Sequence, residues 1–266
     1  MATNETIGTV RLSDGGQLKY AMAGDGAPVV LLHGFGLDRA MWDPQWNLFA
    51  ARHRTIRYDF RGFGASSLPT GPYSHVDDFR VLMEHLGVSR VHLVGLSMGG
   101  RNALRIAAEL PQAIRSLTLI DPALDGHVWS ELWMARWQAI AAAAKSDVGR
   151  AKQLWLEHEL FMPAREQPAV AQTLEAMVHR YSGWHFKHRD PQTNASAPTD
   201  ILASIAAPTL LIVGERDLED FHLIARRLAS GLPTVSLHVL SGVGHMANLE
   251  DPDRVNELAL AHFARG

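Results

Sequence analysis

The sequence predicts an α/β fold, with a mostly parallel central sheet, helices on both faces of that sheet and a helical cap insertion. Two observations predict this class. Short apolar, β-branched runs alternate with segments of helical composition along most of the chain, as in strands joined by crossover helices. The alternation stops between residues 122 and 198, where no good strand pattern occurs. We therefore expect residues 1–121 and 199–266 to form one α/β core and residues 122–198 to form the cap.

The first two strands are expected to pair antiparallel, because the turn Ser13-Asp-Gly-Gly16 between them is typical of a hairpin. Several later strands are continuous apolar runs, as expected where parallel strands are buried on both faces. Parallel strands end at one edge of the sheet, where open α/β sheets bind their ligands. Strands are expected at residues 6–12, 17–23, 29–32, 55–58, 91–94, 116–120, 209–213 and 235–240, and helices at residues 44–51, 76–86, 101–110, 221–229 and 253–263.

The run Val91-His-Leu-Val-Gly-Leu-Ser-Met-Gly-Gly100 predicts a strand that turns abruptly into a helix, with Ser97 at the turn. This is the G-x-S-x-G pattern in the context that a nucleophilic serine requires. A strained, positive-φ corner would lift the Ser97 hydroxyl clear of the backbone, and its crowding explains glycine at positions 95 and 99. The alternative is an ordinary Gly/Ser turn, because the bare pattern is weak in a chain with 22 glycines. The flanking strand and helix favour a nucleophile.

Ser97 needs a base, because a hydroxyl attacks well only when its proton is removed, and the base needs a carboxylate to orient it. The expected chain order is serine, acid, histidine, so only later residues qualify. His245 is the best placed of the 14 histidines, on a Gly-rich loop between a strand and a helix that begins at Pro252. A solvent-facing loop histidine is the alternative. Packing or solvation is the better explanation for His222, His238 and His262, which fall inside expected helices or a strand.

Asp217 is the preferred acid, because it follows the buried apolar strand that ends before Gly214, whose turn could aim the carboxylate. Of the two strands that are followed by a candidate aspartate, that strand is also the nearer to His245 in sequence. Asp121 is the rival, since it also follows a strand. However, Pro122 comes next, which is typical of an exit to the following segment. Further alternatives are Asp220 and Glu215.

Two backbone N–H groups are expected to stabilise the oxyanion that forms when a carbonyl is attacked. One belongs to Met98, directly after Ser97 and at the start of a helix. The other belongs to Phe35, in the loop His33-Gly-Phe-Gly36 after an early buried strand. Each donor of this kind contributes about 3–4 kcal/mol to the transition state. His33 itself is interpreted as structural, because it precedes Ser97 in the chain.

Five motifs together indicate a known family: His33-Gly-Phe-Gly36, Tyr58-Asp-Phe-Arg-Gly-Phe-Gly64, Gly95-Leu-Ser-Met-Gly99, Gly214-Glu-Arg-Asp217 and Gly244-His245. On these motifs the chain resembles the α/β-hydrolase superfamily over nearly its whole length, which implies the α/β-hydrolase fold. The first third, with Met41-Trp-Asp-Pro-Gln45, is similar to the 3-oxoadipate enol-lactonases and their esterase relatives. Many relatives carry a proline four residues after the acid. This chain has Phe221 there, so the loop at Asp217 is expected to differ.

The composition indicates which cellular compartment and which binding partners to expect. A net charge of −3, from 25 basic and 28 acidic residues, favours neither nucleic acid nor an anionic membrane as a partner. The chain has no cysteine, which excludes disulfides and thiolate metal sites and fits a reducing cytoplasm. Neither a signal peptide nor an apolar run of the ~20 residues that span a bilayer is apparent. We expect a cytoplasmic protein with a small-molecule substrate; the oligomeric state is left open.

The expected cap, residues 122–198, has apolar residues at helical spacing and is interpreted as three or four helices over Ser97. Packing onto the core explains most of its tryptophans, and one or two of them are expected to line a pocket. His185 and His188 have a spacing seen in metal sites, but no third ligand completes the set, so no metal is expected. No Gly-rich phosphate motif opens a helix after a strand, so no cofactor is expected. Five of the seven tryptophans fall in this segment: Trp129, Trp133, Trp137, Trp155 and Trp184.

These observations favour a serine hydrolase that cleaves a carboxylic ester or lactone through Ser97, His245, Asp217 and an acyl-enzyme. One alternative is hydrolysis of a carbon–carbon bond in a vinylogous diketone, because those relatives share the triad and a similar serine turn. Another is a ligand receptor on the same fold that turns over slowly. Dehalogenases and epoxide hydrolases are disfavoured, because they use an aspartate where this chain has Ser97.

Overall fold

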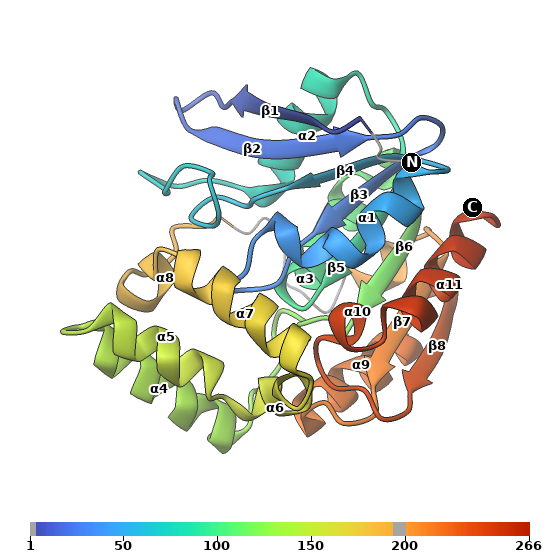
Figure 1. The fold of residues 1–266 in the computed structure, drawn as a ribbon. Helices are drawn as coiled ribbons and strands as arrows, with labels where there is room; N and C mark the ends of the chain where they lie inside the picture. Colours follow the sequence, from blue (N-terminus) through green and yellow to red (C-terminus); the bar gives the residue numbers. More distant parts are fainter. Residues whose placement is uncertain (1–3, 194–200) are drawn as a thin grey trace.

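The computed structural model describes residues 4–193 and 201–266, and its centre is one eight-stranded sheet (Figure 1). The strand order is β1-β2-β4-β3-β5-β6-β7-β8. The β1–β2 and β2–β4 pairs are antiparallel and all other pairs are parallel, as the sequence predicts. The strands are β1 (Thr6–Arg11), β2 (Gln17–Ala23), β3 (Pro28–Leu32), β4 (Arg54–Tyr58), β5 (Val91–Leu96), β6 (Ile114–Ile120), β7 (Thr209–Gly214) and β8 (Val235–Leu240).

The register of the parallel strands aligns their carboxyl ends. Leu32 pairs with Gly95, Leu96 with Ile120, and Gly214 with Leu240. The loops that leave these strands therefore start at the same edge of the sheet, and they carry Phe35, Ser97, Asp217 and His245.

Helices cover both faces of the sheet. On one face α1 (Asp43–Ala50) packs against α11 (Pro252–Phe263), with the rings of Phe49 and Phe263 5.4 Å apart. On the other face α2 (His75–Leu86) packs against α3 (Met98–Glu109), and α9 (Glu219–Gly231) packs on β7 and β8. A further short helix, α10 (Ala247–Glu250), precedes α11.

Helix α2 shows how local sequence sets these boundaries. The Ser74 hydroxyl caps its start by accepting hydrogen bonds from the N–H groups of Val76 (3.2 Å) and Asp77 (3.3 Å). Gly87 ends it in the left-handed conformation, with φ of 63°. The apolar side chains of the helix recur at helical spacing and are buried on the sheet, namely Val76, Phe79, Leu82 and Met83.

Five α-helices lie between β6 and β7 in the described part of the chain, at the carboxyl edge of the sheet (Figure 1). The sequence predicts three or four, because α6 and α8 have only four residues each, too few to show a periodic pattern. The expected boundary at residues 198–199 lies outside the described residues. The helices are α4 (Glu131–Ala144), α5 (Val148–Leu156), α6 (Met162–Arg165), α7 (Pro168–Arg180) and α8 (Trp184–Lys187).

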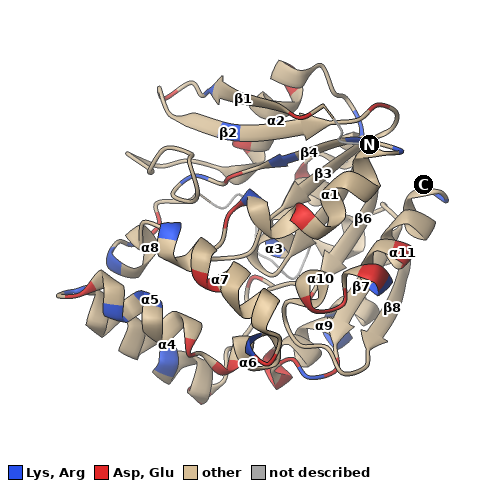
Figure 2. Ribbon diagram, viewed as in Figure 1, with Lys and Arg blue, Asp and Glu red and all other residues tan. Residues whose placement is uncertain are grey.

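Charged residues of both signs are interspersed over the face shown in Figure 2. None of the helices in residues 4–193 and 201–266 is both long and apolar enough to cross a membrane.

The first turn of α3 packs unusually close to the end of β3. A Cβ atom added at Gly99 would lie 2.2 Å from the Leu32 carbonyl oxygen and 2.8 Å from that of His33. The sequence predicts a later helix start, at residue 101, because glycine disfavours helix. The helix nevertheless begins at Met98, because Gly99 packs against the end of β3 and only glycine lets the two backbones come this close.

We therefore expect Gly99→Ala to destabilise the protein by about 1–3 kcal/mol, because backbone atoms have to move. Gly71→Ala is the matched control, since nothing lies within 4 Å of a Cβ atom there. Its effect should stay within about 0.5 kcal/mol. Urea unfolding of both variants measures the difference, and equal stabilities would contradict the packing argument.

Candidate active site

Ser97 occupies a strained corner between β5 and α3, with φ of 55° and ψ of −115°. Three backbone hydrogen bonds of 3.0 Å fix this corner. The Ser97 N–H donates to the Ile120 carbonyl, and the Ser97 carbonyl accepts from the N–H groups of Arg101 and Ala123. A Cβ atom at Gly95 would lie 2.4 Å from the Gly99 carbonyl oxygen, so glycine is needed here for close approach. The strand, corner and helix predicted around Ser97 are all present.

His245 and Asp217 form a buried pair at the same edge of the sheet. His245 Nδ1 lies 2.7 Å from Asp217 Oδ2, and their side chains are 2% and 0% exposed. The second oxygen, Asp217 Oδ1, accepts a 2.7 Å hydrogen bond from the Leu218 N–H. Close packing of the two loops brings the pair together, because a Cβ atom at Gly214 would lie 2.2 Å from the Gly244 carbonyl oxygen. The ring of Phe221 lies against His245, with 4.3 Å between ring centres.

Glu250 holds the His245 loop in place, a role that sequence reasoning missed. Its Oε2 accepts from the Gly244 N–H at 2.7 Å, and its Oε1 accepts from the Met246 N–H at 3.0 Å. The residues on either side of His245 are thus tied to one buried carboxylate. The sequence offers no signal for this, because Glu250 looks like any acidic residue near the start of a helix.

The alternative acids have other partners. Asp220 accepts hydrogen bonds from the Ser130 N–H (2.9 Å) and hydroxyl (2.7 Å). Glu215 accepts from Ser241 and Gly242, at 2.9 Å each, on the surface. Neither interaction directs these carboxylates to His245.

Asp121 lies much closer to the pair. It is fully buried at the end of β6, has φ of 41°, and accepts a 2.9 Å hydrogen bond from the Gly214 N–H through Oδ1. Its Oδ2 is buried without a hydrogen-bond partner among the described residues. Burial raises the pKa of Asp121 well above its usual value, and the neighbouring charge of Asp217 raises it further. Asp121 therefore holds a proton to higher pH than an ordinary aspartate.

The proposed oxyanion donors lie next to Ser97. Met98 is the first residue of α3, so its N–H has no acceptor within the helix. Phe35, Ser97 and His245 surround a cavity of about 10 Å³, roughly the room that one water needs. His33 holds the Phe35 loop, because its Nε2 accepts from the Phe60 N–H at 3.0 Å while its Nδ1 lies 2.8 Å from the Gly34 carbonyl.

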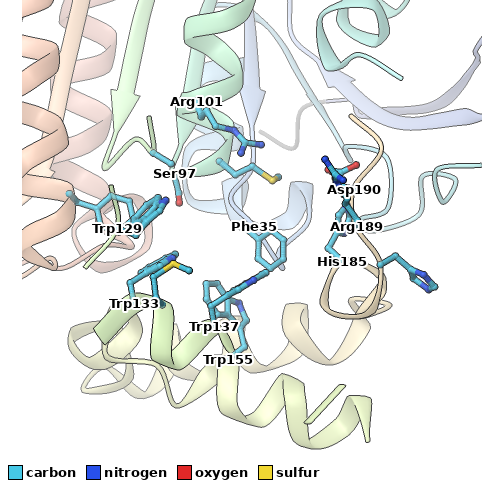
Figure 3. Close-up of a pocket in the computed structure, with 15 residues that line it drawn as sticks. Phe35, Ser97, Arg101, Trp129, Trp133, Trp137, Trp155, His185, Arg189 and Asp190 are labelled. Atoms are coloured by element: carbon cyan, nitrogen blue, oxygen red, sulfur yellow. Dashed lines mark ion pairs between the residues drawn. The ribbon is translucent and has the colours of Figure 1, made fainter. Parts of the chain in front are cut away.

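A pocket of about 520 Å³ opens beside Ser97, between the sheet edge and the inserted helices (Figure 3). Its wall combines Phe35, Ser97 and Met98 with aromatic side chains of the insertion. The sequence predicts one or two lining tryptophans, but four line the pocket, because Trp133 and Trp137 are four residues apart on α4 and therefore share one face of that helix. These are Trp129, Trp133, Trp137 and Trp155.

His185 and His188, the histidine pair of the insertion, line the pocket, and each stacks on an aromatic ring, His188 on that of Trp184 with 5.0 Å between ring centres. His185 stacks on Phe63, with 4.3 Å between ring centres, and its Nδ1 lies 2.8 Å from the Tyr181 hydroxyl. His188 is exposed. Within residues 4–193 and 201–266, one group of three potential metal ligands lies within 4.8 Å, namely Asp121, Asp217 and His245. The hydrogen bond between Asp217 and His245 already uses one ligand atom of each.

Comparison with known proteins identifies the family. The model of the alpha/beta hydrolase family matches residues 29–258, most of the chain. The chain belongs to the alpha/beta hydrolase family. This alpha/beta hydrolase is 30% identical, over 257 residues, to a Variovorax paradoxus protein named as the carbamate hydrolase RutD, with 93% of this chain and 96% of that protein covered.

Lactone-cleaving proteins are also among the similar alpha/beta hydrolases. The 3-oxoadipate enol-lactonase 2 of Acinetobacter baylyi is 26% identical over 261 residues, which cover 93% of each chain. The solved structure of Est816, described as an N-acyl homoserine lactone degrading enzyme, superposes with a TM-score of 0.77 at 29% identity and covers 96% of this chain and 99% of its own. The resemblance to esterases and enol-lactonases expected from the motifs is confirmed.

The buried setting of His245 in this alpha/beta hydrolase predicts the pH dependence. Burial lowers the pKa of His245 from 6.5 to about 4, although Asp121 and Glu250 act in the opposite direction. The neutral imidazole is the form that accepts a proton, and a lowered pKa keeps this form at lower pH. We expect kcat/KM to stay level down to pH 6.5 and to fall only below it. A fall centred at pH 6.5, the ordinary value for histidine, or above it would contradict this environment.

The two carboxyls should differ sharply in their effect on turnover. Asp217→Asn removes the negative charge and lets an amide N–H group face His245 Nδ1, which favours the wrong imidazole tautomer, so we expect kcat to fall by about 10⁴. Asp121→Asn keeps an oxygen that can accept from the Gly214 N–H, so the loss should be far smaller. Steady-state kinetics on both variants, with thermal unfolding as a folding control, compare them. A larger loss at Asp121 would move the orienting role to the end of β6.

Proposed function

We propose that the protein hydrolyses a carboxylic ester or lactone with Ser97 as nucleophile, His245 as base and Asp217 as the carboxylate that orients His245. The observation that carries the proposal is the strained Ser97 corner beside the buried His245–Asp217 pair. A serine, an imidazole and a carboxylate in this order can support acyl transfer.

In the proposed reaction Ser97 Oγ attacks the carbonyl carbon while His245 Nε2 takes its proton. The N–H groups of Phe35 and Met98 stabilise the oxyanion of the tetrahedral intermediate. The intermediate collapses to the acyl-enzyme, and His245 passes the proton to the leaving oxygen. Water, activated by His245, then releases the acid and restores Ser97. Burial raises the pKa of Asp217, while the hydrogen bond from the Leu218 N–H acts in the opposite direction. In its ionised form Asp217 stabilises the imidazolium.

The pocket and the relatives support an ester or lactone as substrate. The aromatic wall suits an apolar acyl or alcohol group, and the pocket volume of about 520 Å³ is that of a small-molecule site. The proteins described as an enol-lactonase and as an N-acyl homoserine lactone degrading enzyme favour the oxygen ester, and the relative named as a carbamate hydrolase adds carbamates as a second candidate class. We further propose that α4–α8 act as a cap that excludes water from this pocket.

A substrate panel tests the proposal against its alternatives. It contains short p-nitrophenyl esters, a lactone, an aryl carbamate and a vinylogous diketone from ring cleavage. Sustained turnover of an ester or lactone supports the proposal, whereas exclusive turnover of the diketone favours carbon–carbon hydrolysis. A single burst without turnover favours a receptor.

Ser97→Ala should lower kcat to within ~10³–10⁴ of the uncatalysed rate, because the oxyanion donors remain when the nucleophile is lost. Unfolding temperature should stay close to that of the wild type, since the hydroxyl lies at the pocket. The assignment is wrong if Ser97→Ala keeps most of the activity on the best substrate of the panel.

A further inference from the structure

Arg101 lies one helical turn after Ser97 on α3, and its side chain lines the same pocket (Figure 3). Its N–H donates to the Ser97 carbonyl at 3.0 Å, so the position of Arg101 is coupled to the nucleophile corner. Across the pocket are the aromatic rings of Trp133 and Trp137 from α4. The pocket therefore has an apolar wall and a cationic wall, with Ser97 between them.

The guanidinium of Arg101 is poorly neutralised by the described residues. Its Nε is buried without a hydrogen-bond partner, and Asp125 Oδ1, its ion-pair partner, is 3.9 Å away. The other oxygen of Asp125 is bound by Arg105. Burial lowers the pKa of Arg101, although 28% of its side chain stays exposed.

Asp190 also lines the pocket, but it has partners of its own. The Tyr73 hydroxyl and the Gln192 N–H donate to its two oxygens at 3.3 Å each, and His185 Nε2 lies 3.8 Å away. Burial raises the pKa of Asp190, while its hydrogen bonds from Tyr73 and Gln192 and the charge of Arg101 act in the opposite direction.

We propose that Arg101 binds a carboxylate of the substrate, so that the preferred ester or lactone carries an anionic group as well as an apolar body. This inference rests on the proposed function. The planar guanidinium fork matches the two oxygens of a carboxylate and stays charged in a partly dry site. A carboxylate bound there would accept hydrogen bonds from the guanidinium of Arg101. The ester or lactone carbonyl of the substrate would then face Ser97, and its hydrocarbon part would lie on the tryptophans.

The test uses two pairs of esters that differ only in one charge. Monomethyl adipate and methyl adipamate place the carboxylate or its neutral amide on the acyl side. The acetyl ester of γ-hydroxybutyrate and its amide place them on the alcohol side, so the two pairs show which half of the substrate reaches Arg101. For each pair the ratio of kcat/KM values, anionic over neutral, is measured in wild type, Arg101→Gln and Arg189→Gln. Arg189 is the matched control, because it lines the same pocket but is exposed.

Wild type should prefer the anionic member of at least one pair, and Arg101→Gln should lower that ratio by about tenfold or more, the effect of losing one charge-assisted hydrogen-bonded pair. Arg189→Gln should change the ratio much less, because solvent screens its charge. Arg101→Lys keeps the charge without the fork and should lie between wild type and Arg101→Gln.

Two outcomes overturn the inference while leaving the proposed function intact. One is hydrolysis of the neutral esters with no anionic preference in wild type. The other is an anionic preference of wild type that Arg101→Gln leaves unchanged, or that is lost in Arg189→Gln but not in Arg101→Gln. If none of the esters is hydrolysed at all, the proposed function fails first. Should Arg101→Gln not fold, inhibition of wild type and Arg101→Lys by hexanoate and hexanamide decides. Binding of the carboxylate at Arg101 predicts that the advantage of hexanoate over hexanamide shrinks in Arg101→Lys, whereas binding at the oxyanion donors leaves this advantage unchanged and overturns the inference.

Discussion

The left-handed backbone corner at Ser97 is the constraint on which the site depends. A non-glycine residue in such a conformation costs of the order of 1–3 kcal/mol and persists only where its surroundings hold it. Here the hydrogen bonds to Ile120 and Ala123 hold it, and the missing side chains at Gly95 and Gly99 let α3 come up against β3 and β5. The same corner directs the hydroxyl towards the pocket and starts the helix that carries Arg101.

A second close backbone contact, between Gly214 at the end of β7 and Gly244, brings the loops of Asp217 and His245 together. Burying a carboxylate and an imidazole is unfavourable unless their hydrogen-bonding atoms are satisfied. Asp217 meets this condition with His245 on one oxygen and the Leu218 N–H on the other, and Glu250 ties down the backbone around His245. The site is therefore held by the ends of strands and by buried hydrogen bonds, which leaves the inserted helices free to set the shape of the pocket.

The sequence predicts the fold and the local features well, because these depend on neighbours in the chain. Strand and helix order follow from apolar periodicity, and the Ser97 turn follows from its glycines. Asp217 and His245 each have a local signal, a glycine turn after a strand. Glu250, Arg101 and the number of lining tryptophans have no such signal, since their roles arise only when α3, the His245 loop and the inserted helices come together. The start of α3 at Met98 was also missed, because packing on β3 overrides the helix propensity of glycine.

The central claim is that Ser97 is a nucleophile activated by its folded surroundings, and covalent labelling tests it most directly. The native protein is treated with a fluorophosphonate and digested, and the modified peptide is located by mass spectrometry. We expect one adduct, on Ser97, that forms much more slowly in Asp217→Asn and not at all in the urea-unfolded chain. An adduct on another residue, or undiminished ester hydrolysis in a protein that takes up no label, would contradict it.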